Sequence, residues 1–541
     1  MGNFQPPVAV NEPVLNYEPD SPERRTLKAE LKRMSSEQVE IPLIIGGKEV
    51  RSGDTANQVM PHRHGHVLGT YHKAGKEEVT KAIDAAEKAH REWSRWPFEE
   101  RAAVFLRAAE LLSTTWRQVA NASSMLNQSK TCHQAEIDSV CELIDFYRFN
   151  VEFAHRIYDE QPLSDAGMWN RLEYRPLEGF VYAISPFNFS SIGGNLCAAP
   201  AIMGGTSIWK PAGSTVFSDY HTMRLLLEAG LPDGVINFIP GNSSAISDVA
   251  LKHRRLAGIH FTGSTQVFQL MWRTVGENIQ NYAAYPRLVG ETGGKDFIIA
   301  HGSADPAAVM AAILRGGYEY QGQKCSAVSR VYLPSSMWKG MKDELVETID
   351  HMTVGDVADF RNFMGAVIDQ SAFDKIKEYI EHAKSSNDAH VLAGGECDDR
   401  EGYFIRPTLI LAEKPDYRSM CEEIFGPVVS LYVYQDAEWE QALKYVDTSS
   451  PYALTGAVFA NDRKAIQDAD RHLRYAAGNF YINDKPTGAV VGQQPFGGSR
   501  ASGTNDKAGS MMNLMRWVTA RTLKETFVPA TEYKYPFMAE S

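Results

Sequence analysis

Cys325 has the residue type and the local setting that covalent chemistry on a carbonyl group needs. It follows Gly322-Gln323-Lys324, between a stretch with helical spacing and a stretch typical of a strand. A glycine this close allows the thiol to lie exposed with its backbone N–H free. That arrangement suits a nucleophile that also stabilises its own oxyanion. The alternative for Cys325 is a buried structural cysteine.

Glu291 is a candidate general base. It lies in Gly290-Glu291-Thr292-Gly293-Gly294-Lys295, where glycines on both sides hold the carboxylate at a turn. A phosphate-binding loop is a rival interpretation, but the spacing differs from GxxxxGK[ST], and Asp296 stands where Ser or Thr is needed. A glutamate that is simply solvated also fits the pattern.

Two further polar residues directly follow expected strands. The side-chain amide of Asn188, in Ser185-Pro186-Phe187-Asn188-Phe189, could donate to a developing oxyanion, although an asparagine here also commonly forms a turn. Lys210, in Ile208-Trp209-Lys210-Pro211, could meet a ribose or phosphate at the carboxyl end of a parallel strand. An exposed lysine at a strand end is the alternative. The dinucleotide fingerprint GxGxxG does not occur in the sequence.

His62, His64 and His66 alternate and would share one face of a strand. Three histidines on one face could hold a metal ion, but no matching carboxylate or cysteine set accompanies them. We therefore expect a surface loop here and no metal site.

The elements that must position these residues follow an alternating pattern. Apolar residues recur at helical spacing over residues 77–120, and a second helical stretch covers 134–158. Short apolar runs then alternate with helical patterns, which predicts a parallel, doubly wound α/β fold. A first series of strands is expected at 179–184, 207–210, 235–239, 258–261, 287–289 and 297–300. A second α/β body has expected strands at 329–333, 428–433, 457–459 and 479–482.

The whole-chain properties exclude several classes of function. A formal net charge of -12 argues against general binding to nucleic acid. Six sparse cysteines without a CxxC pair are typical of free thiols in a reducing compartment. No apolar run approaches the roughly 20 residues of a membrane span. Residues 1–20 contain acidic residues and no Lys or Arg, so we expect no signal or transit peptide within this chain.

Taken together and in order, the motifs resemble the aldehyde dehydrogenase superfamily over about residues 40–527. The motifs are Pro186-Phe187-Asn188-Phe189, Trp209-Lys210-Pro211, Phe261-Thr262-Gly263-Ser264, Gly290 to Lys295, Gly322 to Cys325, and Glu422-Glu423-Ile424-Phe425-Gly426-Pro427. Within the superfamily, the chain most resembles the eukaryotic type of Δ1-pyrroline-5-carboxylate dehydrogenases. That likeness rests on Glu136-Ile137-Asp138, Phe146 to Asn150, Ile192 to Asn195, Gly478 to Lys485, Gly492 to Gly498 and Ala501 to Asp506.

The resemblance implies a role for each candidate residue. Cys325 would be the nucleophile, Asn188 an oxyanion donor and Glu291 the base that activates water. NAD is the implied cofactor, and the residues that would contact it are Lys210, Ser264, Glu423, Phe425 and Pro186. The residues that would contact the substrate are Ser326, Gly488, Ala489, Phe189, Phe496 and Glu142.

The implied reaction is NAD-dependent oxidation of L-glutamate 5-semialdehyde to L-glutamate in proline degradation, through a thiohemiacetal and a thioester on Cys325. Another semialdehyde dehydrogenase of the same superfamily is the alternative. One position departs from the family pattern: Gly213 stands where an acidic residue usually follows the ribose-binding lysine. A carboxylate there would repel a 2′-phosphate, so we expect NAD to be favoured with some tolerance of NADP.

The resemblance also implies a domain organisation and an assembly. Residues 41–165 and 180–300 would form the NAD-binding domain and 301–505 the catalytic domain, after an N-terminal arm at 1–40. Residues 166–179 and 506–541 would form a small β element for oligomerisation, so we expect a homodimer or a larger oligomer. The implied compartment is the mitochondrial matrix, with the cytoplasm as the alternative.

Three other functions compete with this interpretation. An acylating relative would release the thioester to coenzyme A, but the presence of Glu291 argues against it. A non-enzymatic structural protein would not need Cys325, Glu291 and Asn188 together. A cysteine hydrolase needs a histidine partner for Cys325, which is not evident in the sequence, and would leave Lys210 and Glu423 unexplained.

Overall fold

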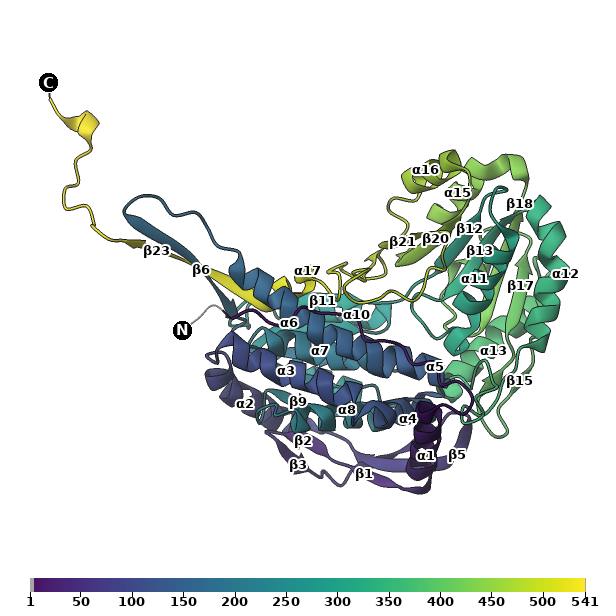
Figure 1. Ribbon diagram of the computed structural model, residues 1–541, viewed down its shortest axis with the longest axis horizontal. Coiled ribbons are helices and arrows are strands. Elements are labelled where there is room, and N and C mark those ends of the chain that lie inside the picture. The colour runs from purple at the N-terminus through teal and green to yellow at the C-terminus, as the bar shows by residue number, and fades with distance from the viewer. Residues whose placement is uncertain (1–3, 541) are drawn as a thin grey trace.

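Two seven-stranded sheets form the two lobes of the protein in a computed structural model that describes residues 4–540 (Figure 1). Both sheets are mainly parallel and carry helices on both faces, so the predicted α/β fold class is confirmed. Residues 1–3 of the predicted N-terminal arm and residue 541 of the predicted oligomerisation element lie outside the described residues. Among residues 4–540, no helix is both long and apolar enough to cross a membrane.

The first sheet has the strand order β11-β10-β7-β8-β9-β2-β3. Its first five strands are parallel, and β2 and β3 add an antiparallel edge. Their bounds are β2 Leu43–Ile45, β3 Lys48–Val50, β7 Phe180–Ile184, β8 Thr206–Lys210, β9 Ile236–Phe238, β10 Leu256–Thr262 and β11 Arg287–Glu291.

Helices cover both faces of this sheet. The helices are α2 (Lys76–Trp93), α3 (Phe98–Ser113), α4 (Arg117–Gln128), α6 (Leu143–Asp159), α7 (Ser190–Ile202), α8 (Val216–Glu228), α9 (Ser243–Ala250) and α10 (Thr265–Glu277). The predicted helical stretch at 77–120 corresponds to α2, α3 and the start of α4. The stretch at 134–158 corresponds to α5 (Cys132–Ala135), a π-helix at Glu136–Glu142, and α6.

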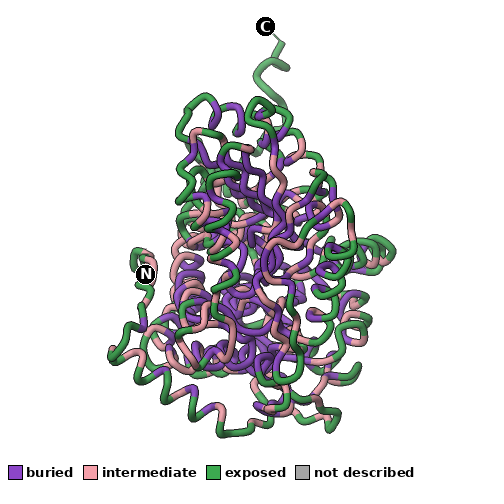
Figure 2. The backbone as a smooth tube through the Cα atoms, turned by 90° about the vertical axis from the view of Figure 1, so that its right-hand side faces the viewer, coloured by how far each residue is buried: buried purple, intermediate pink, exposed green. Residues whose placement is uncertain are grey.

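Strand β7 shows why the sheet is buried on both sides. Its alternate residues Phe180, Tyr182 and Ile184 join the core under α2, α9 and α10. Val181 and Ala183 face the opposite core, which contains α3, α6, α7 and α8. Because side chains alternate along a strand, an unbroken apolar run fills two cores at once. Figure 2 shows that buried segments of the chain gather in the interior of the molecule and exposed segments lie at its periphery.

The second sheet has the order β14-β17-β18-β13-β12-β20-β21, parallel except for the β14 edge. Its helices are α11 (Pro306–Tyr318) and α12 (Ser335–His351) on one face, and α13 (Gln370–Ser385), α15 (Trp439–Thr448) and α16 (Arg463–His472) on the other. The strands are β12 Asp296–Ala300, β13 Val328–Pro334, β14 Ala389–Ala393, β17 Thr408–Ala412, β18 Val428–Tyr434, β20 Thr455–Phe459 and β21 Asn479–Ile482.

The prediction placed one strand, β12, in the wrong sheet. Residues 297–300 were expected in the first series, but β12 pairs with β13 and β20 in the second sheet. The chain therefore passes between the sheets in the few residues from Glu291 to Asp296, ahead of the expected domain boundary at residue 300. Strand spacing along the sequence does not show this, because β11 and β12 follow each other without a helix.

The interpretation of the three histidines as a surface loop was wrong. Two of them, His64 and His66, lie in β5 (Arg63–His72), which pairs with β1 (Val39–Ile41) and β4 (Thr55–Met60) in a separate small sheet. His62 is buried, and its Nδ1 lies 3.2 Å from the Ser129 hydroxyl. Within residues 4–540, no group of three or more His, Cys, Asp or Glu is placed to hold a metal ion.

The two ranges expected to form the β element for oligomerisation, 166–179 and 506–541, each contribute a strand, and these strands pair with each other. They are β6 (Met168–Pro176) and β23 (Val518–Thr526), an antiparallel two-stranded arm that projects from the first lobe (Figure 1). Among residues 4–540, no third strand joins this sheet. The side chains of Gln161 and Ser164 hydrogen-bond the backbone along the outer edge of β6, so the outer edge of β23 is the one left open to a further strand.

Candidate active site

The Cys325 loop has a backbone conformation that few sequences tolerate. Between α11 and β13, Tyr320, Gln321 and Gly322 are all left-handed, with φ of 51°, 55° and 63°. A side chain at Gly322 would collide with the carbonyl of Gly426, so glycine is required there. The turn brings Cys325 to the start of β13, facing the loops that leave the first sheet.

The Cys325 thiol lies in acidic surroundings. All six cysteines are free, and Cys325 is only partly exposed. Burial raises the pKa of this thiol well above its ordinary value, and nearby negative charge raises it further. The charge comes from Asp296, Glu291, Glu423 and Glu142. The thiol is therefore protonated at neutral pH in this form of the protein, and attack on a carbonyl requires that its proton be removed.

Asn188 joins the first sheet to the Cys325 loop. It lies between β7 and α7, is buried, and donates from Nδ2 to the carbonyl of Gln323 at 3.0 Å. Gln323 is two residues before Cys325. A side-chain amide carries two N–H groups, and this hydrogen bond uses one of them. The other can serve an oxyanion that forms beside Cys325.

Glu291 ends β11, and its carboxylate lies against the loop at Gly497. Its Oε2 is buried without a hydrogen-bond partner. Burial raises the pKa of Glu291 well above its ordinary value, and the ammonium of Lys507 offsets part of that effect. A buried carboxylate with a raised pKa and an open oxygen is a suitable proton acceptor for water.

Glu423 and Phe425 lie on the other side of the thiol. Glu423 accepts a hydrogen bond from the backbone N–H of Gly294 at 2.8 Å, and burial raises the pKa of its carboxyl. The ring of Phe425 packs edge-on against Phe187, with centroids 5.6 Å apart. Glu423, Phe425, Gly294 and Cys325 line one small cavity, so residues from distant parts of the chain meet at the thiol.

The predicted cofactor residues Lys210, Pro186 and Ser264 follow neighbouring strands of the first sheet. Lys210 ends β8 and is buried, and burial lowers its pKa to about 8. Pro186 is two residues beyond β7. Ser264 follows β10 and caps α10, accepting from the N–H of Val267 at 3.4 Å. The carboxyl ends of parallel strands and a helix N-terminus form the type of edge where dinucleotides bind.

Gly213 lies in the loop after β8, close to this edge. Its carbonyl accepts from the Gln58 amide at 2.7 Å. A side chain added at Gly213 would meet the Tyr71 hydroxyl at 3.5 Å, an ordinary contact distance. No carboxylate side chain is present at this position to repel a 2′-phosphate. The tolerance of NADP that this absence led us to expect stays a prediction.

The predicted substrate loop lies beside Cys325. The Ser326 hydroxyl, adjacent to Cys325, is 2.8 Å from the hydroxyl of Thr487. Thr487 precedes Gly488, which has a φ of 93°, and Ala489. Phe496, at the far end of this loop, is held by a pair of backbone hydrogen bonds with Ala508 of 3.0 and 2.8 Å.

A buried ion pair lies close to Phe189 and affects the pKa of Glu142. The ammonium of Lys130 pairs with Asp138 and lies 4.8 Å from the centre of the Phe189 ring and 4.7 Å from that of Tyr320. Glu142 ends the π-helix, and burial, followed by the charge of Asp138, raises its pKa to about 8.

Several residues of the site were not predicted. Asp138 accepts hydrogen bonds from the N–H groups of Ser190 and Ser191, both at 3.0 Å, and so fixes the start of α7 beside Asn188. Lys130 and Thr487 were also missed. Only Asp138 carried a signal, because it lies in one of the motifs that supported the family resemblance. The contacts of Lys130 and Thr487 join segments far apart in the sequence.

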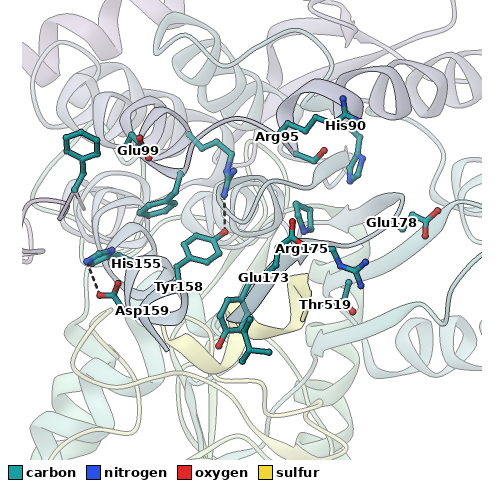
Figure 3. Close-up of a pocket in the computed structure, with 17 residues that line it drawn as sticks. His90, Arg95, Glu99, His155, Tyr158, Asp159, Glu173, Arg175, Glu178 and Thr519 are labelled. Atoms are coloured by element: carbon teal, nitrogen blue, oxygen red, sulfur yellow. Dashed lines mark hydrogen bonds and ion pairs between the residues drawn. The ribbon is translucent and has the colours of Figure 1, made fainter. Parts of the chain in front are cut away.

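A separate hollow lies at the base of the β6–β23 arm, between α2, α3 and α6 (Figure 3). It is lined by polar side chains such as His90, Arg95, His155 and Arg175. The predicted site residues are absent from its lining, so it is not part of the Cys325 site.

Residues 49–523 match the model of the aldehyde dehydrogenase family. The chain belongs to this family. Among curated relatives of this aldehyde dehydrogenase, "Delta-1-pyrroline-5-carboxylate dehydrogenase, mitochondrial" of Dictyostelium discoideum is 52% identical, covering 99% of this chain and 96% of the relative. The Homo sapiens protein of that name is 46% identical and covers 98% of this chain and 94% of its own.

Solved structures give the same result for the fold of this aldehyde dehydrogenase. The crystal structure of the Delta-pyrroline-5-carboxylate dehydrogenase from Mycobacterium tuberculosis superposes with a TM-score of 0.96 at 55% identity, covering 99% of both chains. That enzyme has also been solved bound with NAD, again with a TM-score of 0.96. The family resemblance found in the sequence is confirmed.

The raised pKa of Cys325 predicts slow alkylation of this aldehyde dehydrogenase at neutral pH. Because the thiolate is the reactive form, the rate with iodoacetamide should still rise beyond about pH 8.5, the ordinary pKa of a free thiol. Peptide mass spectrometry of the cofactor-free protein measures modification at Cys325 itself, and the Cys325→Ala variant controls for the other cysteines. A rate that levels off below about pH 8 would contradict the prediction.

Proposed function

We propose that this aldehyde dehydrogenase oxidises L-glutamate 5-semialdehyde, in equilibrium with 1-pyrroline-5-carboxylate, to L-glutamate, with NAD as the oxidant, in proline degradation. The observation that carries the proposal is the Ser326–Thr487 hydrogen bond. It places the glycine loop at Gly488 beside the nucleophile Cys325. The names of the curated relatives and the NAD-bound Mycobacterium tuberculosis structure support the same reaction.

The reaction begins with the thiol of Cys325. Its proton passes to solvent water as the sulfur attacks the aldehyde carbon, and the new C–S bond turns the carbonyl oxygen into an oxyanion. The remaining amide N–H of Asn188 and the backbone N–H of Cys325 stabilise that oxyanion. One such donor contributes about 10²- to 10³-fold in rate.

The residues at the edge of the first sheet fit a dinucleotide. Lys210 is a buried lysine at a strand end, and Ser264 caps the N-terminus of a helix. Glu423 places a carboxylate beside the thiol. Phe425 and Pro186 would pack beside the nicotinamide. Bound NAD supplies the acceptor for the hydride that leaves the tetrahedral carbon, after which the acyl group is a thioester on Cys325.

Hydrolysis of the thioester completes the cycle. Glu291 takes a proton from water, the hydroxide adds to the acyl carbon, and the C–S bond breaks to release the new carboxylic acid. The sulfur of Cys325 recovers a proton as its pKa requires. The balanced reaction consumes one aldehyde, one NAD and one water, and produces the acid, NADH and a proton.

The substrate residues fit an amino acid with an aldehyde at its far end. Backbone N–H groups at Gly488 and Ala489, with the Ser326 hydroxyl, would bind the α-carboxylate. The rings of Phe189 and Phe496 would enclose the aliphatic part. Glu142 would face the ammonium group, since a nearby positive charge favours the ionised form of a carboxyl whose pKa burial has raised to about 8.

The substrate is tested by following NADH absorbance with 1-pyrroline-5-carboxylate and with simple aliphatic and aromatic aldehydes. We expect strong turnover of the pyrroline with NAD, weaker turnover with NADP, and little activity on the other aldehydes. The Cys325→Ala variant should be inactive, whereas the matched Cys421→Ala variant should keep wild-type activity. Turnover of simple aldehydes alone would reject this substrate and favour another semialdehyde dehydrogenase of the superfamily.

The role of Glu291 predicts a separation of the two chemical stages. Glu291→Gln should lower the steady-state kcat by about 10²- to 10⁴-fold, because the base for hydrolysis is lost. Rapid-mixing absorbance should still show a burst of NADH stoichiometric with enzyme, because thioester formation is intact. The control is Glu422→Gln, whose carboxylate faces Tyr379 and Arg418. Loss of both burst and turnover would contradict this assignment.

The β6–β23 arm supports a homodimer or larger assembly. The outer edge of β23 has no strand partner among residues 4–540, and the apolar side chains of Trp169 and Phe527 are 49% and 61% exposed. Light scattering should give at least twice the chain mass of 60.2 kDa. A solution mass of a single chain would reject this proposal.

The mitochondrial matrix is the proposed compartment, because relatives from Dictyostelium discoideum and Homo sapiens are named mitochondrial. The relative from Agaricus bisporus carries the enzyme name alone. Recovery of the protein in the cytosolic fraction of its cells would favour the cytoplasm instead.

A further inference from the structure

The N-terminal strap, residues 9–17, lies across the π-helix and α6 without forming a helix or strand (Figure 1). The backbone N–H of Ala9 donates to Glu152 at 2.8 Å. At the other end, the N–H of Leu15 and the hydroxyl of Tyr17 donate to the two carboxylate oxygens of Glu136, at 3.0 and 2.8 Å. Helix side chains therefore fix the strap at both ends.

Asn11, inside the strap, contacts two walls of the site at once. Its Nδ2 donates to Asp145 Oδ2 and to the carbonyl oxygen of Val491, both at 2.8 Å. Its Oδ1 accepts from the Gln493 amide at 2.9 Å. Asp145 also accepts the backbone N–H of Glu12 at 2.7 Å. Both amide hydrogens and the amide oxygen of Asn11 are thus engaged.

The two walls that Asn11 joins are those assigned to the substrate. Asp145 is three residues after Glu142, and on a helical segment that spacing puts them on the same side. Val491 and Gln493 lie a few residues after Gly488 and belong to the same loop. The Thr487 end of the loop is held by Ser326, so Asn11 supplies the second anchor.

The loop itself has little other support between these anchors. Residues 486–490 belong to no helix or strand. The Val490 N–H makes a short-range hydrogen bond to the Gln494 side chain at 2.9 Å. Thr487 and Val491 are buried, whereas Gly488 between them is exposed. The conformation of the Gly488–Ala489 backbone therefore depends on what holds each end of the segment.

We propose that Asn11 is a positioning residue that holds the Gly488–Ala489 loop in its substrate-binding conformation, so that the N-terminal strap sets the selectivity for a substrate with an α-carboxylate. This inference rests on the proposed function. A flexible loop loses conformational entropy when it closes on a carboxylate, whereas a loop that is already ordered does not. The ordered loop therefore binds more tightly without a new contact to substrate. A simple aldehyde has no carboxylate and gains nothing from the ordered loop.

The test compares Asn11→Ala with Tyr17→Phe. The first removes both hydrogen bonds from strap to loop, and the second removes a strap hydrogen bond to Glu136 and leaves the loop contacts intact. Asn11→Ala should raise the KM for 1-pyrroline-5-carboxylate by about fivefold to thirtyfold, as expected for two hydrogen bonds. Its kcat, and its kcat/KM for a simple aliphatic aldehyde, should stay near the wild-type values. Tyr17→Phe should leave the KM for the pyrroline near wild type.

Hydrogen exchange of the loop gives a readout that does not depend on the substrate. Backbone amides of residues 487–494 should exchange faster in Asn11→Ala than in wild type and in Tyr17→Phe, with thermal stability measured for all three. Unchanged exchange in this loop overturns the proposal, as does a KM rise of the same size in both variants or for both substrates. If wild type fails to oxidise the pyrroline, the proposed function is rejected, and the exchange result alone decides whether the strap orders the loop.

Discussion

The hydrogen bond from the Asn188 amide to the carbonyl of Gln323 links the loop after β7 to the loop that carries Cys325. The first loop belongs to one sheet and the second to the other, so this contact sets how far Asn188 lies from Cys325. The hydrogen bond from the Gly294 N–H to Glu423 makes a second link across the same cavity. The candidate site exists only where the two sheets meet.

The contact between the two sheets also buries several ionisable side chains together, away from water. Burial raises the pKa values of Cys325, Glu291 and Glu142, and lowers that of Lys210. In each case the neutral form is favoured because a buried charge loses its hydration. The shift raises the pKa values of the two carboxyl groups out of the acidic range and lowers that of Lys210 toward neutral pH. It moves the pKa of the Cys325 thiol further from neutral pH. The unpartnered oxygen of Glu291 is consistent with a group that exchanges protons with water.

Most of the architecture was predictable, and the failures have physical causes. Continuous apolar runs such as 180–184 identified the buried parallel strands, because each fills a core on both faces of a sheet. The run at 297–300 was recognised as a strand and assigned to the wrong sheet, since periodicity reports burial and carries no information about neighbours. Strands β14 and β17, the β2–β3 hairpin and the small sheet of β5 were not predicted. Strands β2 and β3 have three residues each, too few for a clear period. Strand β5 has ten residues, but exposed and buried positions do not alternate regularly along it.

The residues of the candidate site divide in the same way. Cys325, Glu291 and Asn188 were found because glycine-rich or strand-end settings mark them locally, and because the order of the motifs matched one family. The chemistry that these side chains can perform was thus determined by the sequence alone. The Lys130–Asp138 pair and the contacts of Asn11 with Asp145 and Val491 were decided only by the tertiary structure. Lys130 and Asp138 are eight residues apart, but the rings of Phe189 and Tyr320 that pack on Lys130 are distant along the chain. The partners of Asn11 are distant as well, so these contacts depend on how the chain packs.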